Sequence, residues 1–299
     1  MKRVKELINK LGVSVLGYKI INNRIIINTD NGRYVIKKNK YIDKDKLFNY
    51  LESRKFIYFL KPIYSNKFYD IYPYIKENNL SLEEKYYDLI SIVSYLHLRT
   101  FFYKKLTEEE VNDKYDELKK QILTLEEYYY NLQDKIEEIE IMSPSNYLLI
   151  RNISLFYRSL NLCKNYLDKW YKLVFHNKRK RLVTLYNNLN DSNILISNNT
   201  YLINWERTFK GSPIYDLYSL YLNVYGEYNY TSLYNLYISK NNLLEEEIYM
   251  LYILLLMPSK ILLIDDELKQ CQEIRKNITK IEVAIDFVLN NGSKQQKEE

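Results

Sequence analysis

The chain has 299 residues, of which 46% are hydrophobic and 27% charged, so it can bury a core and is neither a disordered tail nor a fibrous repeat. A net charge of +6 is too balanced to indicate a nucleic-acid binder by itself. Six glycines and five prolines disfavour a sandwich of many tight turns and favour helices. Cys163 and Cys271 lie far apart without CxxC spacing, which excludes a disulfide framework and a zinc knuckle.

The sequence predicts a soluble protein. Glu6 and Lys10 interrupt what would have to be the apolar region of a signal peptide. The most apolar stretch, residues 248–257, is closed by Pro258 and is well short of the roughly 20 apolar residues that span a bilayer. We therefore expect a protein of the cytoplasm with no membrane span.

Residues 1–75 predict a small antiparallel sheet with one helix. Asp30-Asn31-Gly32 is a hairpin turn signal, and so is Asn22-Asn23. Leu47, Phe48 and Leu51 have helical spacing within residues 43–53, which predicts a helix against the sheet. The segments rich in Ile, Val, Tyr and Phe predict five strands at 14–21, 24–29, 33–38, 56–61 and 67–73.

From residue 81 onward the apolar residues repeat with a helical period. Ser81 and Thr107 are both followed by Glu three residues later, which is typical of capped helix starts. Helices are predicted from these points and over 146–174, with short strands at 182–186, 194–197 and 201–205. The fold class is therefore α+β, with a sheet-containing N-lobe (1–75), a mostly helical C-lobe (76–292) and a disordered tail (293–299).

The segment from residue 182 to 217 carries the informative motif. It reads Tyr186-Asn187-Asn188, then Asn193, then Ile203-Asn204-Trp205-Glu206. This layout resembles the kinase-like fold of aminoglycoside and choline phosphotransferases, and more closely the CotS-type spore-coat branch. The family pattern is His-Gly-Asp, four residues, Asn, then a strand that ends Ile-Asp-Trp-Glu. The resemblance implies a two-lobed kinase-like protein.

Other segments fit the resemblance in the same order. Lys37 ends Tyr-Val-Ile-Lys, like the strand with the family's phosphate-binding lysine, and Glu52 falls where its ion-pair partner is expected. Tyr72 and Tyr74 join them as candidate nucleotide-binding residues. A Lys–Glu pair can also serve packing alone. Further matching segments are 96–100, 211–217 and 256–260.

Two departures from the family pattern decide the predicted function. Asn188 stands where the family has its catalytic aspartate, and Asn204 stands where it has its metal-binding aspartate. A neutral amide cannot act as a general base, which is worth roughly 10²–10⁴-fold in rate, and Mg²⁺ prefers carboxylates. We therefore predict a catalytically inactive protein that acts by binding or assembly with protein partners, in the cytoplasm or on the spore coat. It would require no cofactor and would bind ATP and Mg²⁺ weakly at most.

Two alternatives stay open at the level of sequence. The first is an active small-molecule phosphotransferase whose metal site uses Asn193, Asp191 and Glu206, although Asp191 can equally cap a loop and Glu206 can be an ordinary surface acid. The second is a nucleic-acid binder that uses the basic run 178–181. Four basic residues on a balanced chain are more typical of a solvated turn, so this option is disfavoured.

Overall fold

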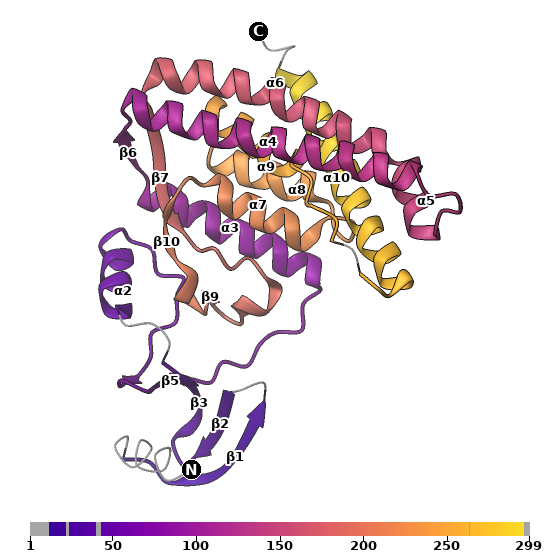
Figure 1. The fold of residues 1–299 in the computed structure, drawn as a ribbon. Helices are drawn as coiled ribbons and strands as arrows, with labels where there is room; N and C mark the ends of the chain where they lie inside the picture. Colours follow the sequence, from indigo (N-terminus) through magenta and orange to yellow (C-terminus); the bar gives the residue numbers. More distant parts are fainter. Residues whose placement is uncertain (1–11, 22–23, 40–42, 263, 296–299) are drawn as a thin grey trace. The chain divides into compact units, whose positions relative to one another are not determined.

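The computed structural model describes residues 12–21, 24–39, 43–262 and 264–295. The chain forms two compact units, which are described separately (Figure 1). Unit 1 comprises residues 1–100 and 190–208, and unit 2 comprises residues 101–189 and 209–299. Residues 76–100 and 190–208 thus cluster with the N-terminal segment, whereas the sequence predicts an N-lobe that ends at residue 75.

Unit 1 contains the predicted five-stranded antiparallel sheet, with the strand order β1-β2-β3-β5-β4. One predicted strand is wrong: residues 56–61 form no strand and make only an isolated bridge between Phe59 and Leu202. The rings of Phe56 and Phe59 instead pack against Trp205 in an aromatic cluster. The strands are β1 (Val15–Ile21), β2 (Arg24–Thr29), β3 (Gly32–Lys38), β4 (Tyr64–Ser65) and β5 (Tyr69–Pro73).

The two faces of this sheet differ, because side chains alternate along each strand. Ile27, Ile36 and Ile71, on β2, β3 and β5, form a buried apolar cluster on one face. Their neighbours Lys37 and Tyr72 project to the other face, which lines a cavity. The period of two in the sequence therefore places the charged side chain of Lys37 at the cavity and not in the core.

The rest of unit 1 consists of two helices and a hairpin. Ser81 caps α3 as predicted, since its Oγ accepts from the Glu84 N–H and Glu84 accepts from the Ser81 N–H. The predicted strand 201–205 is shorter than expected, and residues 205–207 form a 3₁₀ turn. The elements are α2 (Lys44–Ser53), α3 (Leu82–Thr100), η1 (Asp191–Asn193), β8 (Ile194–Ile196), β9 (Thr200–Leu202) and η2 (Trp205–Arg207).

Unit 2 combines a three-stranded sheet, ordered β10-β7-β6, with a set of helices in which α4 and α6 lie side by side (Figure 1). Thr107 caps α4 through the predicted capping box with Glu110. The elements are β6 (Phe102–Lys105), β7 (Arg179–Leu185), β10 (Phe209–Gly211), α4 (Glu108–Glu137), α5 (Pro144–Arg151), α6 (Ile153–Asn177), α7 (Ile214–Val224), α8 (Tyr230–Lys240), α9 (Glu245–Leu256) and α10 (Glu267–Gln295).

Three predictions for unit 2 need correction. The single helix predicted over 146–174 is two helices, α5 and α6, separated at Asn152, whose side-chain amide donates to the Leu148 carbonyl. The basic run is not a solvated turn, because Lys178 ends α6 and the next three residues begin β7. The predicted disordered tail is helical to Gln295, and residues 296–299 lie outside the described residues.

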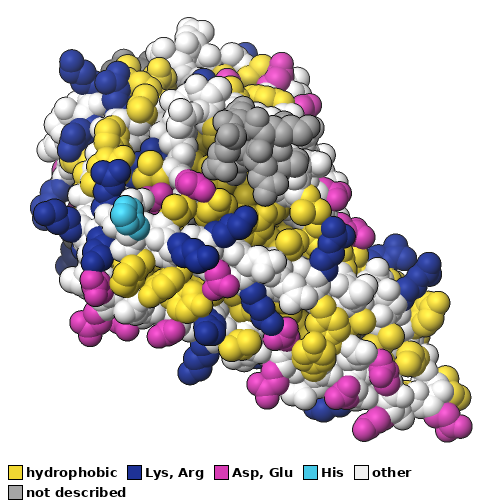
Figure 2. All heavy atoms as spheres, turned by 90° about the horizontal axis from the view of Figure 1, so that it is seen from above, with side chains coloured by type: hydrophobic (Ala, Val, Ile, Leu, Met, Phe, Trp, Pro, Cys, Tyr) yellow, Lys and Arg dark blue, Asp and Glu magenta, His cyan; other side chains and the backbone are white. Residues whose placement is uncertain are grey.

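Lys and Arg side chains and Asp and Glu side chains both occur over the face drawn in Figure 2. Among the residues described, no helix is long and apolar enough to cross a membrane.

Candidate functional site

Unit 1 contains a cavity of about 540 Å³ on the face of the sheet that carries Lys37. This volume lies within the range of typical small-molecule sites. Apolar side chains such as Val35 and Phe48 line part of its wall. Tyr186, which begins the motif that contains Asn188, is fully buried in unit 2 and does not line this cavity. The predicted site residues that do line it are Lys37, Tyr72, Tyr74, Asp191, Asn204 and Glu206.

The β8–β9 hairpin brings two asparagines together. Ile194 pairs with Leu202 at the open end of the hairpin, so the residues just before β8 and just after β9 are neighbours. The Ile203 N–H accordingly donates to the Asn193 carbonyl at 3.0 Å. Asn204 has left-handed backbone angles (φ 62°, ψ 60°), which asparagine and aspartate tolerate better than most residues.

Trp205 anchors this loop to unit 1. Its indole is 4% exposed, packs edge-on against the Phe56 and Phe59 rings, and donates to the Leu202 carbonyl at 2.9 Å. Phe59 in turn stacks on Phe48 of α2, with ring centroids 4.7 Å apart. Because Trp205 is held on three sides, its neighbour Asn204 has a fixed position beside the sheet.

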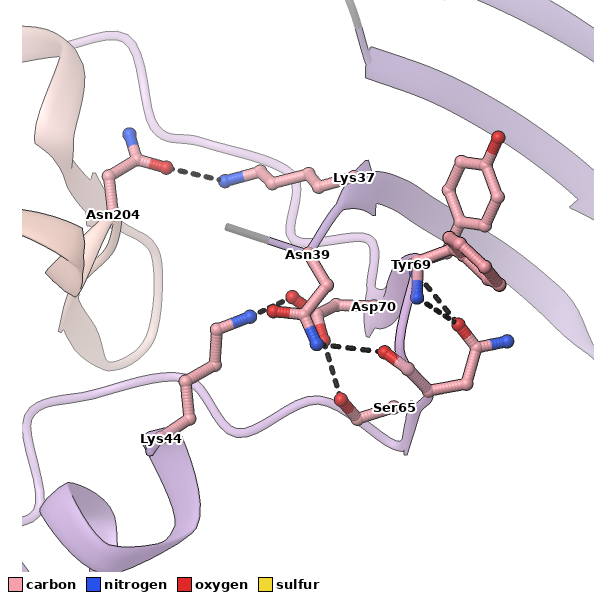
Figure 3. Close-up of polar contacts among 9 residues, drawn as sticks. Lys37, Asn39, Lys44, Ser65, Tyr69, Asp70 and Asn204 are labelled. Carbon is pink, nitrogen blue, oxygen red and sulfur yellow. Dashed lines mark hydrogen bonds and ion pairs between the residues drawn. The ribbon is translucent and has the colours of Figure 1, made fainter. Parts of the chain in front are cut away.

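Lys37, Asn204 and Asn193 form a continuous hydrogen-bonded chain. The Lys37 ammonium donates to Asn204 Oδ1 at 2.9 Å (Figure 3). The Asn204 amide donates through Nδ2 to Asn193 Oδ1 at 2.6 Å. The two amide oxygens therefore both accept hydrogen bonds from within the protein, and one of them faces an ammonium group.

Lys37 lies in an environment that disfavours its charge. Burial, followed by the positive charge of Arg24, lowers the pKa of Lys37 to about 8, although Glu206 acts in the opposite direction. Its ammonium lies 5.6 Å from the centroid of the Tyr72 ring. Burial also raises the pKa of Tyr72 above its usual range, so this phenol stays neutral. An anion in the cavity would stabilise the charged form of Lys37.

The expected ion pair between Lys37 and Glu52 is not formed. Glu52 lies 2.6 Å from the ammonium of Lys61 and does not line the cavity, so this predicted site residue is corrected. Lys37 uses Asn204 as its acceptor instead. The spacing along the sequence was right for a strand and a helix, but it cannot specify toward which side of the helix a carboxylate points.

Sequence reasoning missed the buried acid of the site, Asp70. It is 1% exposed on β5, opposite Lys37 in the strand register, and pairs with the ammonium of Lys44 (Figure 3). Ser65 Oγ donates to the same carboxylate at 2.7 Å. Asp70 is therefore satisfied by Lys44 and Ser65. A lone acid within the aromatic run Tyr-Asp-Ile-Tyr was the available signal for it.

The residues present do not fit a bound Mg²⁺. Asn193 and Asn204 supply neutral oxygens that are already hydrogen-bonded, whereas Mg²⁺ is normally held through carboxylates and phosphates. Asp191 and Glu206 line the same cavity, Glu206 from the η2 turn and not from the strand that was predicted. In the part of the chain that the structure describes, no three His, Cys, Asp or Glu side chains gather as a metal site would need.

Asn188 belongs to unit 2, in the loop that follows β7. The beginning of that loop is fixed by Asp216, which is fully buried in α7 and accepts the backbone N–H groups of Tyr186 and Asn187 at 2.8 and 2.7 Å. Asn187 has a positive φ of 52°. Asp216 thus holds the chain just before Asn188, a positioning role that the sequence match at 211–217 did not specify.

Comparison with known proteins identifies the fold. No protein-family model and no curated protein matches the chain. An aminoglycoside phosphotransferase from Alicyclobacillus acidocaldarius superposes with a TM-score of 0.62 at 12% identity, over 95% of this chain and 93% of that one. The AMP-bound spectinomycin phosphotransferase APH(9)-Ia superposes with a TM-score of 0.50 at 14% identity, over 94% and 98% of the two chains. The chain therefore has the kinase-like fold of the aminoglycoside phosphotransferases.

Proposed function

We propose that this protein is a kinase-like binding protein that takes a nucleotide, or a similar phosphate compound, into the cavity of unit 1 without a divalent metal and does not transfer phosphate. The observation that carries the proposal is the Lys37–Asn204–Asn193 chain. It places an amide, Asn204, where the resembling pattern has its metal-binding aspartate, and it leaves the lysine beside the cavity. Asn188 is a second amide, at the position that resembles the catalytic aspartate.

The cavity has the features that an anionic, partly apolar ligand needs. Arg24, Lys37 and Lys38 line it from the sheet, and Val35 and Tyr72 supply apolar and aromatic surface. Phosphate oxygens near Lys37 would offset the burial and the repulsion from Arg24 that lower its pKa. An AMP-bound relative of the same fold gives this choice of ligand support.

A biological role follows from the resemblance to the spore-coat branch. A kinase-like protein that binds but does not turn over a nucleotide is suited to assembly, in which a ligand stabilises one conformation for a protein partner. We place that role in the cytoplasm of a sporulating cell or on the developing spore coat.

Calorimetric titration with ATP, in EDTA and in Mg²⁺, tests the proposal. We expect binding in EDTA that Mg²⁺ does not strengthen, because the metal would lower the charge of ATP without finding protein ligands. Lys37→Met should weaken binding at least tenfold, whereas Lys46→Met, which changes an exposed lysine on α2, should leave it unchanged. Absence of ATP binding in both buffers would refute the proposal.

A working phosphotransferase is the second candidate, because Asp191 and Glu206 line the same cavity as Asn204. Under that reading ATP binding strengthens with Mg²⁺, Glu206→Gln removes the effect, and phosphate appears on an added alcohol. Observation of all three results would favour the enzyme over the binding protein.

A further inference from the structure

Unit 2 contains a second cavity, of about 400 Å³, that the proposed function does not use. It lies where the first turns of α4 and α9 meet the end of α6 and the starts of β7 and α7. Its volume is within the range of small-molecule sites. Its apolar wall is made by Val111, Trp170, Val174, Ile214 and Met250.

An acidic side chain, Glu246, lines this cavity. Glu246, in the first turn of α9, is 9% exposed and lines the cavity. No hydrogen bond or ion pair joins it to any other residue that the structure describes. Its carboxylate oxygens are not among the described side-chain atoms that are fully buried without a partner, so they are open to the cavity and could form a charge-assisted hydrogen bond with a cationic group.

Arg181, the buried cation of the cavity lining, is already engaged. Arg181 donates from Nε and Nη2 to the Glu247 carboxylate at 3.0 and 2.6 Å, and from Nη1 to Asn241 Oδ1 at 3.2 Å. Its guanidinium therefore neutralises Glu247 and not Glu246. The buried end of the cavity, formed by Arg181, Glu246 and Glu247, keeps one negative charge in excess.

The charges at the rim largely cancel. Glu110 accepts from Lys104 at 2.7 Å, and Glu117 accepts from Lys114 at 2.8 Å. Asp113 adds one negative charge, and Arg179 and Lys180 add one positive charge each, so the rim has one positive charge in excess. The negative charge that an ammonium group could pair with is therefore at Glu246, beside the apolar wall.

We propose that this cavity binds a small organic ammonium compound, with the ammonium group at Glu246 and the apolar body against Trp170 and Met250. The two requirements select an amine with a hydrocarbon or aromatic body over a metal ion, which would find one carboxylate only, and over a phosphate, which Glu246 would repel. The site lies within unit 2, and the inference does not rest on the nucleotide site.

Calorimetric titration of the full chain with phenethylamine, its neutral analogue 2-phenylethanol, and inorganic phosphate tests the proposal. We expect phenethylamine to bind at least tenfold more tightly than 2-phenylethanol, and phosphate not to bind at this cavity. Glu246→Gln should weaken phenethylamine at least tenfold. Glu245→Gln, an exposed neighbour that hydrogen-bonds Tyr249, is the matched control and should change the affinity less than twofold.

Thermal unfolding of each variant shows whether it is folded, and Glu246→Gln should be as stable as the wild type, because the amide keeps the size and shape of the side chain. The proposal is overturned if no binding of phenethylamine is detected up to about 10 mM, because a dissociation constant above that concentration is too weak for a specific site. It is also overturned if 2-phenylethanol binds equally well, if Glu246→Gln binds as the wild type does, or if phosphate binds and Lys180→Met abolishes that binding.

Discussion

Asn204 differs from the aspartate of the resembling pattern only in having an NH2 group in place of one carboxylate oxygen, and this NH2 group donates a hydrogen bond. Its Nδ2 donates to Asn193 while its Oδ1 accepts from Lys37. An ionised aspartate accepts only, so it could bind Lys37 but could not donate to Asn193. The amide is therefore the side chain that completes this chain of hydrogen bonds.

The pKa of Lys37 predicts a pH dependence of stability. Because burial and Arg24 lower this pKa from 10.5 to about 8, the cost of burying the charge is fully present below pH 8. It is relieved as the pH rises from 8 to about 10.5, where the folded protein has lost a proton that the unfolded chain still holds. The gain has a ceiling of about 3 kcal/mol, reduced by solvent screening because Lys37 is only partly buried.

Urea denaturation of the wild type and Lys37→Met at pH 7.5 and 10 measures this gain as a difference, which cancels the other groups that titrate in the range. The free energy of unfolding of the wild type should rise relative to that of the variant. A difference that stays constant, or that falls with pH, would show that Lys37 has an ordinary pKa.

The residues of the Lys37–Asn204–Asn193 chain could be predicted from the sequence, but the ion pairs around that chain could not. Lys37, Asn193 and Asn204 follow from motifs whose spacing is local. The pair Lys44–Asp70 depends on how α2 is oriented against β5, and the pair Lys61–Glu52 depends on how α2 is oriented against the residues that follow this helix. Such pairings between elements leave no periodic signal in the sequence.

At the scale of the elements, β7 shows how burial changes the meaning of a basic run. Arg179 and Lys180 are exposed, whereas Arg181 is 8% exposed and forms its bidentate pair with Glu247 of α9. The strand begins one residue after the left-handed Lys178 that ends α6. Composition alone favours a solvated turn here, because it does not reveal that an acid sixty-six residues later lies opposite.

This pair predicts an asymmetric response to mutation. Arg181→Met should lower the free energy of unfolding by about 3–5 kcal/mol, because it leaves Glu247 charged and buried without its partner. The double change Arg181→Met with Glu247→Leu should recover most of that loss, since no isolated charge remains. Urea denaturation checks both, and a double variant less stable than Arg181→Met would contradict this account.

Other errors at this scale have a common cause. Residues 56–61 are apolar and aromatic like a strand, but Phe56 and Phe59 are used in ring packing with Trp205. The break at Asn152 interrupts an otherwise continuous helical pattern. In both places side-chain packing or hydrogen bonding outweighs the local preference of the backbone.

At the scale of the whole molecule, two compact units each contain a cavity of their own. The cavity of unit 1 is lined by Lys37 and by other basic and acidic side chains. The cavity of unit 2 is lined by Glu246 beside an apolar wall. The fold was predictable because motif order and periodicity extend over most of the chain. The second cavity was not, since its residues come from five elements that are distant in sequence.

A titration with Mn²⁺, followed by the electron paramagnetic resonance signal of the free ion, tests the central claim most directly. Mn²⁺ prefers the same carboxylate and phosphate oxygens as Mg²⁺ and reports its own binding. The wild type should leave the free-ion signal undiminished, and Asn204→Asp, which keeps the shape and backbone tolerance of asparagine, should bind Mn²⁺ measurably. Uptake of one Mn²⁺ per chain by the wild type, lost in Glu206→Gln, would contradict the account.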